Sequence, residues 1–190
     1  MLDFAAGADT PGNELSYITN LPSMAATALY HGKASAPSVE QFVAEARQFA
    51  LGPYAAALLK GQNLQPEERT SIRRQLARFT GLSEAYLDRT DLRVTPSRFY
   101  KELLRDRGLT IGRLDSRYTG KDYDSAGETP DNDPSFYGID GGYTAAANSW
   151  FRDTLGFAND TQYVTIGRVG DWDWKLPGGR DSNAYLNVTP

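Results

Sequence analysis

Ser38-Val-Glu-Gln-Phe-Val-Ala-Glu-Ala-Arg-Gln-Phe-Ala-Leu-Gly-Pro-Tyr-Ala-Ala-Ala-Leu-Leu-Lys-Gly61 is the stretch that decides the fold. Its apolar residues recur every three or four positions, which is the period of one face of an α-helix. Ser38 followed by Gln41 has the pattern of a capping box, and Gly61 ends the helix. Gly52-Pro53 must kink the helix or split it, because proline has no backbone N–H and its ring clashes with the preceding turn.

The sequence on either side of this stretch adds shorter helices with similar boundary signals. Most begin with a proline in the first turn or with a serine or threonine cap, and most end at a glycine. The expected helices cover residues 22–31, 66–80, 83–88 and 95–107. Residues 37–107 are therefore predicted to form a helical bundle.

The second half of the chain is less regular. Short β-like segments at 109–114 and 165–168 share the string Thr-Ile-Gly-Arg and are interpreted as two strands that are candidates to pair. A polar loop is expected over 115–136, and a helix is expected over about 143–155. One face of that helix would carry Tyr143, Ala146, Ala147, Trp150 and Phe151. The glycines that precede it are interpreted as a tight turn into the helix, and they are Gly138, Gly141 and Gly142.

These elements predict a mainly α fold. It consists of a helical bundle with a small two-stranded β element and irregular arms at both ends. Glycine, proline and asparagine punctuate the first arm, and Pro177-Gly-Gly179 marks the last. The expected division is an arm over 1–20, a helical domain over 21–175 and a second arm over 176–190.

The composition limits the chemistry that the chain can perform. It has no cysteine and a single histidine, His31, among 190 residues. A thiolate nucleophile, a disulfide and a cysteine zinc site are therefore excluded, and a serine triad within the chain would have to use His31. No Gly-x-Ser-x-Gly turn accompanies that histidine, which stands at the end of a predicted helix, so a structural role is favoured. No cofactor and no metal are expected.

The charge argues against nucleic-acid and membrane partners. A net charge of −4 does not favour attraction to phosphates or anionic lipids. The most apolar run, residues 54–59, is far too short to span a bilayer, and the first residues lack the pattern of a signal peptide.

Acidic residues are concentrated in the expected loop. Paired carboxylates suit a calcium site or glycoside hydrolysis, but the spacing lacks the glycine and glutamate of a calcium loop. A solvated, turn-rich loop is therefore the favoured interpretation. The residues concerned are Asp122, Asp124, Asp131 and Asp133, with Asp171 and Asp173 further along the chain.

Two further surfaces suggest binding rather than catalysis. Trp172, Trp174 and the tyrosines near the loop suit a peptide- or sugar-binding surface, and a buried strand or an interface would show the same pattern. The helix over 39–58 is a candidate surface for a partner helix in an interaction domain.

Several strings resemble one family, the bacterial serine carboxypeptidases of the carboxypeptidase C or cathepsin A-like branch of the α/β-hydrolases. They occur in the family's order along almost the whole chain. They are PGNELSYITNLPSMAATALYHGK at 11–33, RLDSRYTG at 113–120, YGIDGGYTAAANSW at 137–150, WDW at 172–174 and YLNV at 185–188. The departures are local, since Ser16, Met24 and Leu29 stand where the family has Pro, Tyr and Trp.

The resemblance implies a lid, or cap, domain. In the family the serine nucleophile lies upstream of these strings, and the aspartate and histidine lie downstream, so no catalytic residue maps onto this chain. The implied partners are the α/β-hydrolase core of the parent chain and a peptide substrate, and the implied location is periplasmic or secreted. The residues expected to face the substrate pocket are Arg117, Tyr118, Tyr137 and Tyr143.

Overall fold

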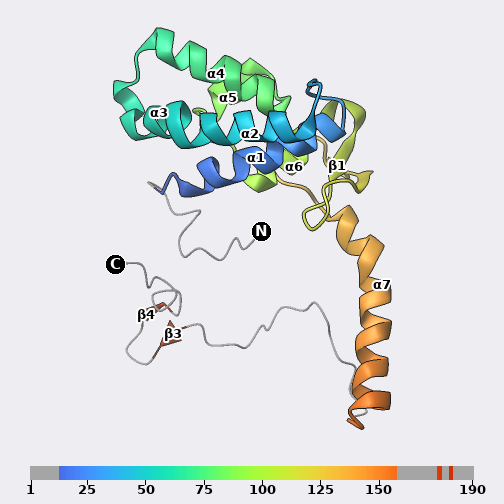
Figure 1. The fold of residues 1–190 in the computed structure, drawn as a ribbon. Helices are drawn as coiled ribbons and strands as arrows, with labels where there is room; N and C mark the ends of the chain where they lie inside the picture. Colours follow the sequence, from blue (N-terminus) through green and yellow to red (C-terminus); the bar gives the residue numbers. More distant parts are fainter. Residues whose placement is uncertain (1–12, 158–174, 177–179, 182–190) are drawn as a thin grey trace.

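The computed structural model describes residues 13–157, 175–176 and 180–181, which are mainly helical (Figure 1). The α-helices are α1 (Leu15–Tyr30), α2 (Val39–Phe49), α3 (Ala55–Lys60), α4 (Pro66–Thr80), α5 (Glu84–Arg89), α6 (Pro96–Glu102) and α7 (Pro134–Ser149). The π- and 3-10 helices are η1 (Ala50–Tyr54), η2 (Gly61–Asn63), η3 (Arg105–Arg107) and η4 (Trp150–Thr154). The strands are β1 (Leu109–Ile111), β2 (Thr119–Lys121), β3 (Lys175–Leu176) and β4 (Arg180–Asp181). Strands β1 and β2 form a small two-stranded antiparallel sheet, and β3 and β4 form a second antiparallel pair at the start of the expected last arm. The predicted fold class is confirmed.

The deciding stretch forms α2, η1 and α3 in succession. The predicted interruption at Gly52-Pro53 is the π-helical segment η1, which carries the proline that cannot donate a helical hydrogen bond. Ser38 caps α2 by accepting a hydrogen bond from the backbone N–H of Gln41 at 3.3 Å. The Gln41 side chain donates to Glu45 at 3.0 Å instead of returning to Ser38, so only half of the expected capping box is present.

The apolar face of this stretch packs into the core of the chain. The ring of Phe79 from α4 lies 5.2 Å from that of Phe42 and 5.5 Å from that of Phe49. The Tyr54 hydroxyl is buried and donates to the carbonyl of Leu92 at 2.6 Å. This face is therefore used internally, and the large apolar side chains of residues 39–58 that stay exposed are Val39 and Leu51.

Helix α1 begins earlier than its pattern indicates. It starts at Leu15, so the prediction of an irregular arm is wrong for residues 15–20, and Pro22 lies inside the helix. A proline in a helix interior costs about 3 kcal/mol. Burial of apolar residues on both sides of Pro22 offsets that cost. These residues are Leu21, Met24, Ala25 and Ala28.

The loop expected over 115–136 contains strand β2. It pairs with β1 in the antiparallel register Leu109↔Lys121, Thr110↔Gly120 and Ile111↔Thr119. The strand expected at 165–168 lies outside the described residues.

Helix α7 begins at Pro134 rather than near Tyr143, so the predicted turn of glycines is wrong. Gly138 lies inside the helix, where a Cβ atom would be only 2.5 Å from the ring of Tyr118. The glycine therefore permits a close approach between the helix and a ring from the β1–β2 turn.

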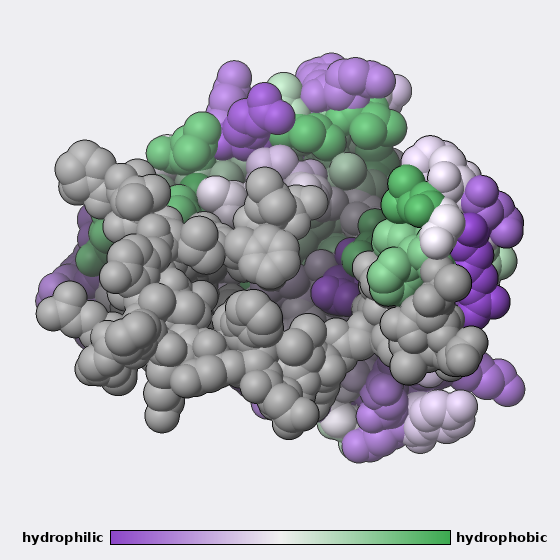
Figure 2. All heavy atoms as spheres, turned by 90° about the horizontal axis from the view of Figure 1, so that it is seen from below, coloured by the Kyte–Doolittle hydropathy of each residue, from purple (hydrophilic) through white to green (hydrophobic). Residues whose placement is uncertain are grey.

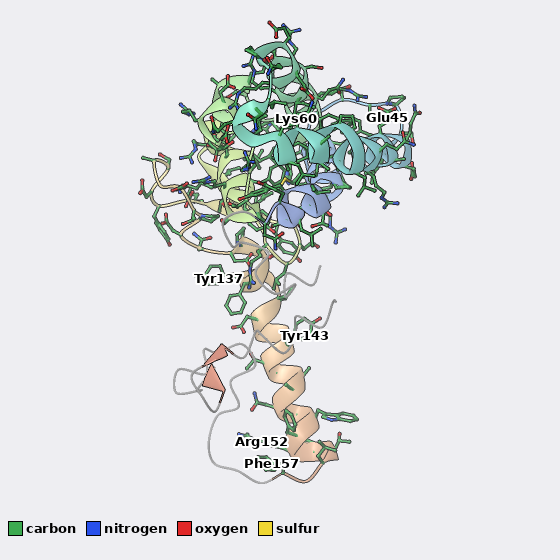
Figure 3. The ribbon with its side chains drawn as sticks, turned by 90° about the vertical axis from the view of Figure 1, so that its left-hand side faces the viewer. Glu45, Lys60, Tyr137, Tyr143, Arg152 and Phe157 are labelled. Atoms are coloured by element: carbon green, nitrogen blue, oxygen red, sulfur yellow. The ribbon has the colours of Figure 1, made fainter. Side chains whose placement is uncertain are left out.

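Helix α7 leads away from the bundle formed by α1–α6 (Figure 1). Tyr137 lies near the end of α7 that adjoins the bundle, Tyr143 lies further along the helix, and Arg152 and Phe157 lie beyond its far end (Figure 3). Only Pro134 and Ser135 of this helix are buried. The face that carries Tyr143 and Trp150 is exposed in the described part of the chain.

We expect Gly81→Ala to destabilise the bundle. Gly81 follows α4 with a φ of +69°, and a Cβ atom there would lie 2.6 Å from Cβ and 2.9 Å from the carbonyl oxygen of Lys33. The left-handed conformation alone costs about 1–2 kcal/mol for a residue with a side chain, and the contacts add to it. The matched control is Gly108→Ala, where the backbone is also left-handed with a φ of +66° and no atom lies within 4 Å. Equal losses in urea unfolding of the two variants would contradict a role for the contact with Lys33.

Candidate functional site

A cleft of about 670 Å³ lies between α1, the start of α6 and the β1–β2 turn. Three segments that are distant in the sequence form its walls. Helix α1 supplies Asn20, Ser23, Met24 and Thr27. The start of α6 supplies Thr95, Pro96, Ser97, Phe99 and Tyr100, and the turn supplies Arg113, Leu114 and Ser116.

The α1 wall follows from helical spacing. Residues 20, 23, 24 and 27 are three or four positions apart, so their side chains share one face of the helix. The Thr27 hydroxyl lies 2.9 Å from that of Ser116, which ties this wall to the β1–β2 turn. The opposite wall begins at Thr95, whose hydroxyl caps α6 and lies 3.2 Å from the Ser97 hydroxyl.

The β1–β2 turn is held by the N-terminus of α7. One oxygen of Asp133, Oδ1, accepts from the backbone N–H of Arg113 at 3.0 Å and also caps α7. The Ser135 hydroxyl accepts from the backbone N–H of Leu114 at 3.0 Å. Gly112 permits this contact, because a Cβ atom there would lie 2.5 Å from Cβ of Ser135. The start of α7 therefore fixes one wall of the cleft.

The carboxyl of Asp133 is stabilised in its ionised form. Burial acts to raise its pKa, but hydrogen bonds from the Ser135 hydroxyl and from backbone N–H groups outweigh burial and hold the pKa below its usual range. A charged cap is therefore available at neutral pH for both the helix and the turn.

Arg113 is the one charged side chain in the described lining of the cleft, and the other polar groups are hydroxyls and an amide. Its side chain is 62% exposed. Seen from below, the described surface shows hydrophobic side chains in separate groups bordered by hydrophilic ones (Figure 2). The cleft thus combines neutral polar groups, some apolar surface and one cation.

His31 lies at the end of α1, as predicted. Its Nε2 atom is 2.7 Å from the backbone carbonyl oxygen of Ser116. A carbonyl oxygen only accepts, so Nε2 carries the hydrogen and donates it. The Ser116 hydroxyl is directed to Thr27 instead, so His31 and Ser116 do not form a nucleophile–base pair.

None of the four residues predicted to face a substrate pocket lines the cleft. Arg117 is exposed and pairs with Asp115, with Nη2 2.6 Å from Oδ2. The ring of Tyr118 lies against Gly138 on α7. Tyr137 and Tyr143 are 71% and 65% exposed on α7. The structure brings Tyr118 to the start of α7, but it does not gather the four side chains into one site.

The ion pair with Arg117 makes the carboxyl of Asp115 unusually acidic. The Arg117 side chain and its backbone N–H donate to Asp115 and lower its pKa to about 2. We therefore expect Asp115 to stay ionised down to about pH 2 in a carboxyl-carbon NMR titration. In Arg117→Gln the titration should move upward toward the ordinary aspartate value of about 3.9. An unchanged midpoint in that variant would contradict the assignment to Arg117.

The acidic loop differs from its predicted solvated form at Asp133, which caps α7, and at Asp122. The side chain of Asp122 is 3% exposed and forms an ion pair with Lys101, whose side chain is 0% exposed. The Lys101 amine also donates to the backbone carbonyl of Asp124. The only sequence signal for this contact is the spacing of Arg98, Lys101 and Arg105, which places three cations along one face beside an acidic loop.

Asp122 and Asp131 also accept hydrogen bonds from the backbone of the loop itself. Asp131 Oδ2 accepts from the backbone N–H of Asp124 at 2.8 Å, and Asp122 Oδ1 accepts from that of Asp131 at 3.3 Å. Within the described ranges, no three histidine, cysteine or acidic side chains are grouped to hold a metal ion. Asp171 and Asp173 lie outside those ranges, as do Trp172 and Trp174.

Sequence reasoning missed most of the cleft. The polar residues of α1 and the hydroxyls at the start of α6 carry no catalytic motif, and only the three- or four-residue spacing of Asn20, Ser23 and Thr27 marked a shared face.

In the part of the chain that the structure describes, no helix is long and apolar enough to cross a membrane. Comparisons with protein-family models, curated proteins and solved structures gave no match.

Proposed function

We propose that this chain is the lid domain of a serine carboxypeptidase-like α/β-hydrolase. It would cover the active site and shape the substrate pocket, and it carries none of the catalytic triad. The observation that carries the proposal is the meeting of two family-like strings at one cleft. Thr27 of the first string and Ser116 of the second touch through their hydroxyls although they are 89 positions apart. Strings that serve a common substrate-facing surface are expected to meet in this way.

The parent reaction implied by the resemblance is cleavage of the C-terminal peptide bond. A serine oxygen would attack the carbonyl carbon while a histidine takes its proton, and the same histidine would return that proton to the leaving amine. Water would then release the acyl group from the serine. A lid contributes by excluding bulk water and by positioning the peptide.

The exposed apolar side chains at the far end of α7 support the interpretation that the lid docks on another surface. Helix α7 leaves the bundle with large apolar side chains exposed in η4 and just past it. They are Trp150, Leu155 and Phe157. Apolar side chains grouped on one protruding element are typical of interaction sites. We assign this element to contact with the hydrolase core, and the family resemblance adds a periplasmic or secreted location.

The coding sequence on both sides of this chain provides the most direct test. The proposal expects a Gly-x-Ser-x-Gly-like elbow upstream and a histidine-bearing segment downstream. A reading frame that holds neither would overturn it. The 190-residue chain alone should not hydrolyse blocked dipeptides at acidic pH. Turnover that His31→Ala abolishes would also overturn the proposal.

Two exposed tyrosines of α7 are expected to affect substrate binding in the intact enzyme. Tyr137→Ala and Tyr143→Ala should raise KM or change the preference among several peptides, because both rings are exposed and belong to one family-like string. Tyr123→Ala is the matched control, since this ring is also exposed and lies outside the lining of the cleft. Unchanged kinetics for all peptides would contradict a pocket-facing role.

A peptide- or sugar-binding module is the second candidate. The hydroxyl-rich cleft favours it, because such a lining supplies donors and acceptors for neutral polar ligands. Titration of the chain with short peptides and with oligosaccharides separates the two ligand classes. An interaction domain that uses residues 39–58 is not supported, because the apolar face of that stretch is buried in the chain's own core.

A further inference from the structure

We propose that the cleft between α1, α6 and the β1–β2 turn binds a carboxylate group of a peptide, and that Arg113 is the residue that recognises it. The proposal rests on the proposed function for the peptide nature of the ligand. The carboxylate is inferred from the charges and contacts of the cleft itself.

The size and lining of the cleft fit a short peptide segment. Its volume of about 670 Å³ falls within the range of about 300–1,000 Å³ of small-ligand sites. Serine and threonine hydroxyls can both donate and accept, so they can pair with the N–H and C=O groups of a peptide backbone. Met24, Phe99 and Leu114 supply apolar surface for side chains.

The charge of the lining selects among peptide ligands. The whole chain is acidic, with a net charge of −4, yet no aspartate or glutamate belongs to the described lining. A ligand ammonium group would find no anionic partner among these residues. A carboxylate would meet Arg113, whose planar guanidinium can donate two parallel hydrogen bonds to it.

The position of Arg113 suits this role. Its backbone N–H donates to Asp133 Oδ1 at 3.0 Å, so the turn that carries it is fixed. Its side-chain Nε lies 3.5 Å from Asp133 Oδ2, which holds the inner edge of the guanidinium near the protein. The two terminal nitrogens donate no hydrogen bond to the residues that the structure describes, and the side chain is largely exposed at the cleft. The outer edge is thus presented to a ligand.

The test compares matched peptides by isothermal titration calorimetry on the full 190-residue chain. One pair is Ala-Ala-Ala-Phe as free acid and as C-terminal amide, and the other is an amidated tetrapeptide with aspartate or with asparagine at one position. We expect the carboxylate member of at least one pair to bind about 10-fold more tightly, the effect of one charge-assisted hydrogen-bonded pair. The first pair reports a C-terminal carboxylate and the second an acidic side chain. Equal affinity within both pairs would overturn the proposal.

Variants assign the preference to Arg113. Arg113→Gln should remove the difference within the responsive pair, and Arg113→Lys should retain part of it, because lysine keeps the charge but lacks the fork. The matched control is Arg74→Gln on α4, an exposed arginine outside the cleft with the same loss of charge, and its preference should equal that of the original chain. Circular dichroism confirms that each variant is folded. A preference that persists in Arg113→Gln would overturn the proposal, whereas the lid assignment is decided separately by the flanking coding sequence.

Discussion

Replacing Lys101 with methionine should lower the free energy of unfolding by about 3–5 kcal/mol, the cost of leaving one member of a buried ion pair without its partner. The side chains of Lys101 and Asp122 are 0% and 3% exposed, so water cannot replace the lost contact without opening the loop. The variant also loses the hydrogen bond from the Lys101 amine to the backbone carbonyl of Asp124. Urea or thermal unfolding followed by circular dichroism measures the change.

Two further variants make this prediction specific. Lys121→Met changes an exposed lysine in the adjacent strand β2 and should alter stability by no more than about 0.5 kcal/mol. Combining Lys101→Met with Asp122→Leu removes both charges, and it should recover most of the loss because no buried charge is left unpaired. A double variant that is as unstable as the sum of the two single variants would show that the pair does not interact.

Replacing Asp133 with alanine should release the β1–β2 turn from α7. Loss of the helix cap costs about 1–2 kcal/mol. Loss of the hydrogen bond from the Arg113 backbone to a charged oxygen costs about 1.5–3 kcal/mol more. We expect hydrogen exchange to accelerate at the start of α7 and in the turn, while the α2–α4 core keeps its protection. Asp133→Asn is the matched control, since it retains an oxygen that can accept these bonds.

The same residue predicts a dependence of stability on pH. The pKa of Asp133 is lower in the folded chain than in the unfolded chain. Its contribution is therefore fully present above the ordinary aspartate pKa of about 3.9 and is lost as the pH falls through the lower folded value. Asp133→Asn should lack this part of the acid dependence, and identical acid profiles of the two proteins would contradict it.

The helices of the bundle were predictable because their signals are local. Ser38, Ser83 and Thr95 each cap the helix that follows, and in each case the bond spans three residues. Gly81 ends α4 in the left-handed conformation that glycine favours. Each of these boundaries depends on neighbours within one turn, so the pattern in the sequence was sufficient.

The sequence predictions that the structure contradicts fail because of contacts between residues that are distant in the chain. Pro22 was expected to begin a helix, but core packing on both sides carries α1 through it. The glycines of α7 were expected to form a turn, but Asp133 caps a helix that already includes them. The predicted site residues were chosen for their place in family-like strings, and the structure lines its cleft with Asn20, Thr95 and Arg113 instead.

The sequence by itself determined the helical class and the position of the interruption at Gly52-Pro53. It also excluded a catalytic triad within the chain that uses a cysteine or any histidine other than His31. The tertiary structure decided that Lys101 and Asp122 are buried together and that α1, α6 and the β1–β2 turn enclose one cleft. The physical reason is the range of the interactions. Capping and periodicity act over one helical turn, whereas an ion pair or a cleft joins side chains that only the folded chain brings together.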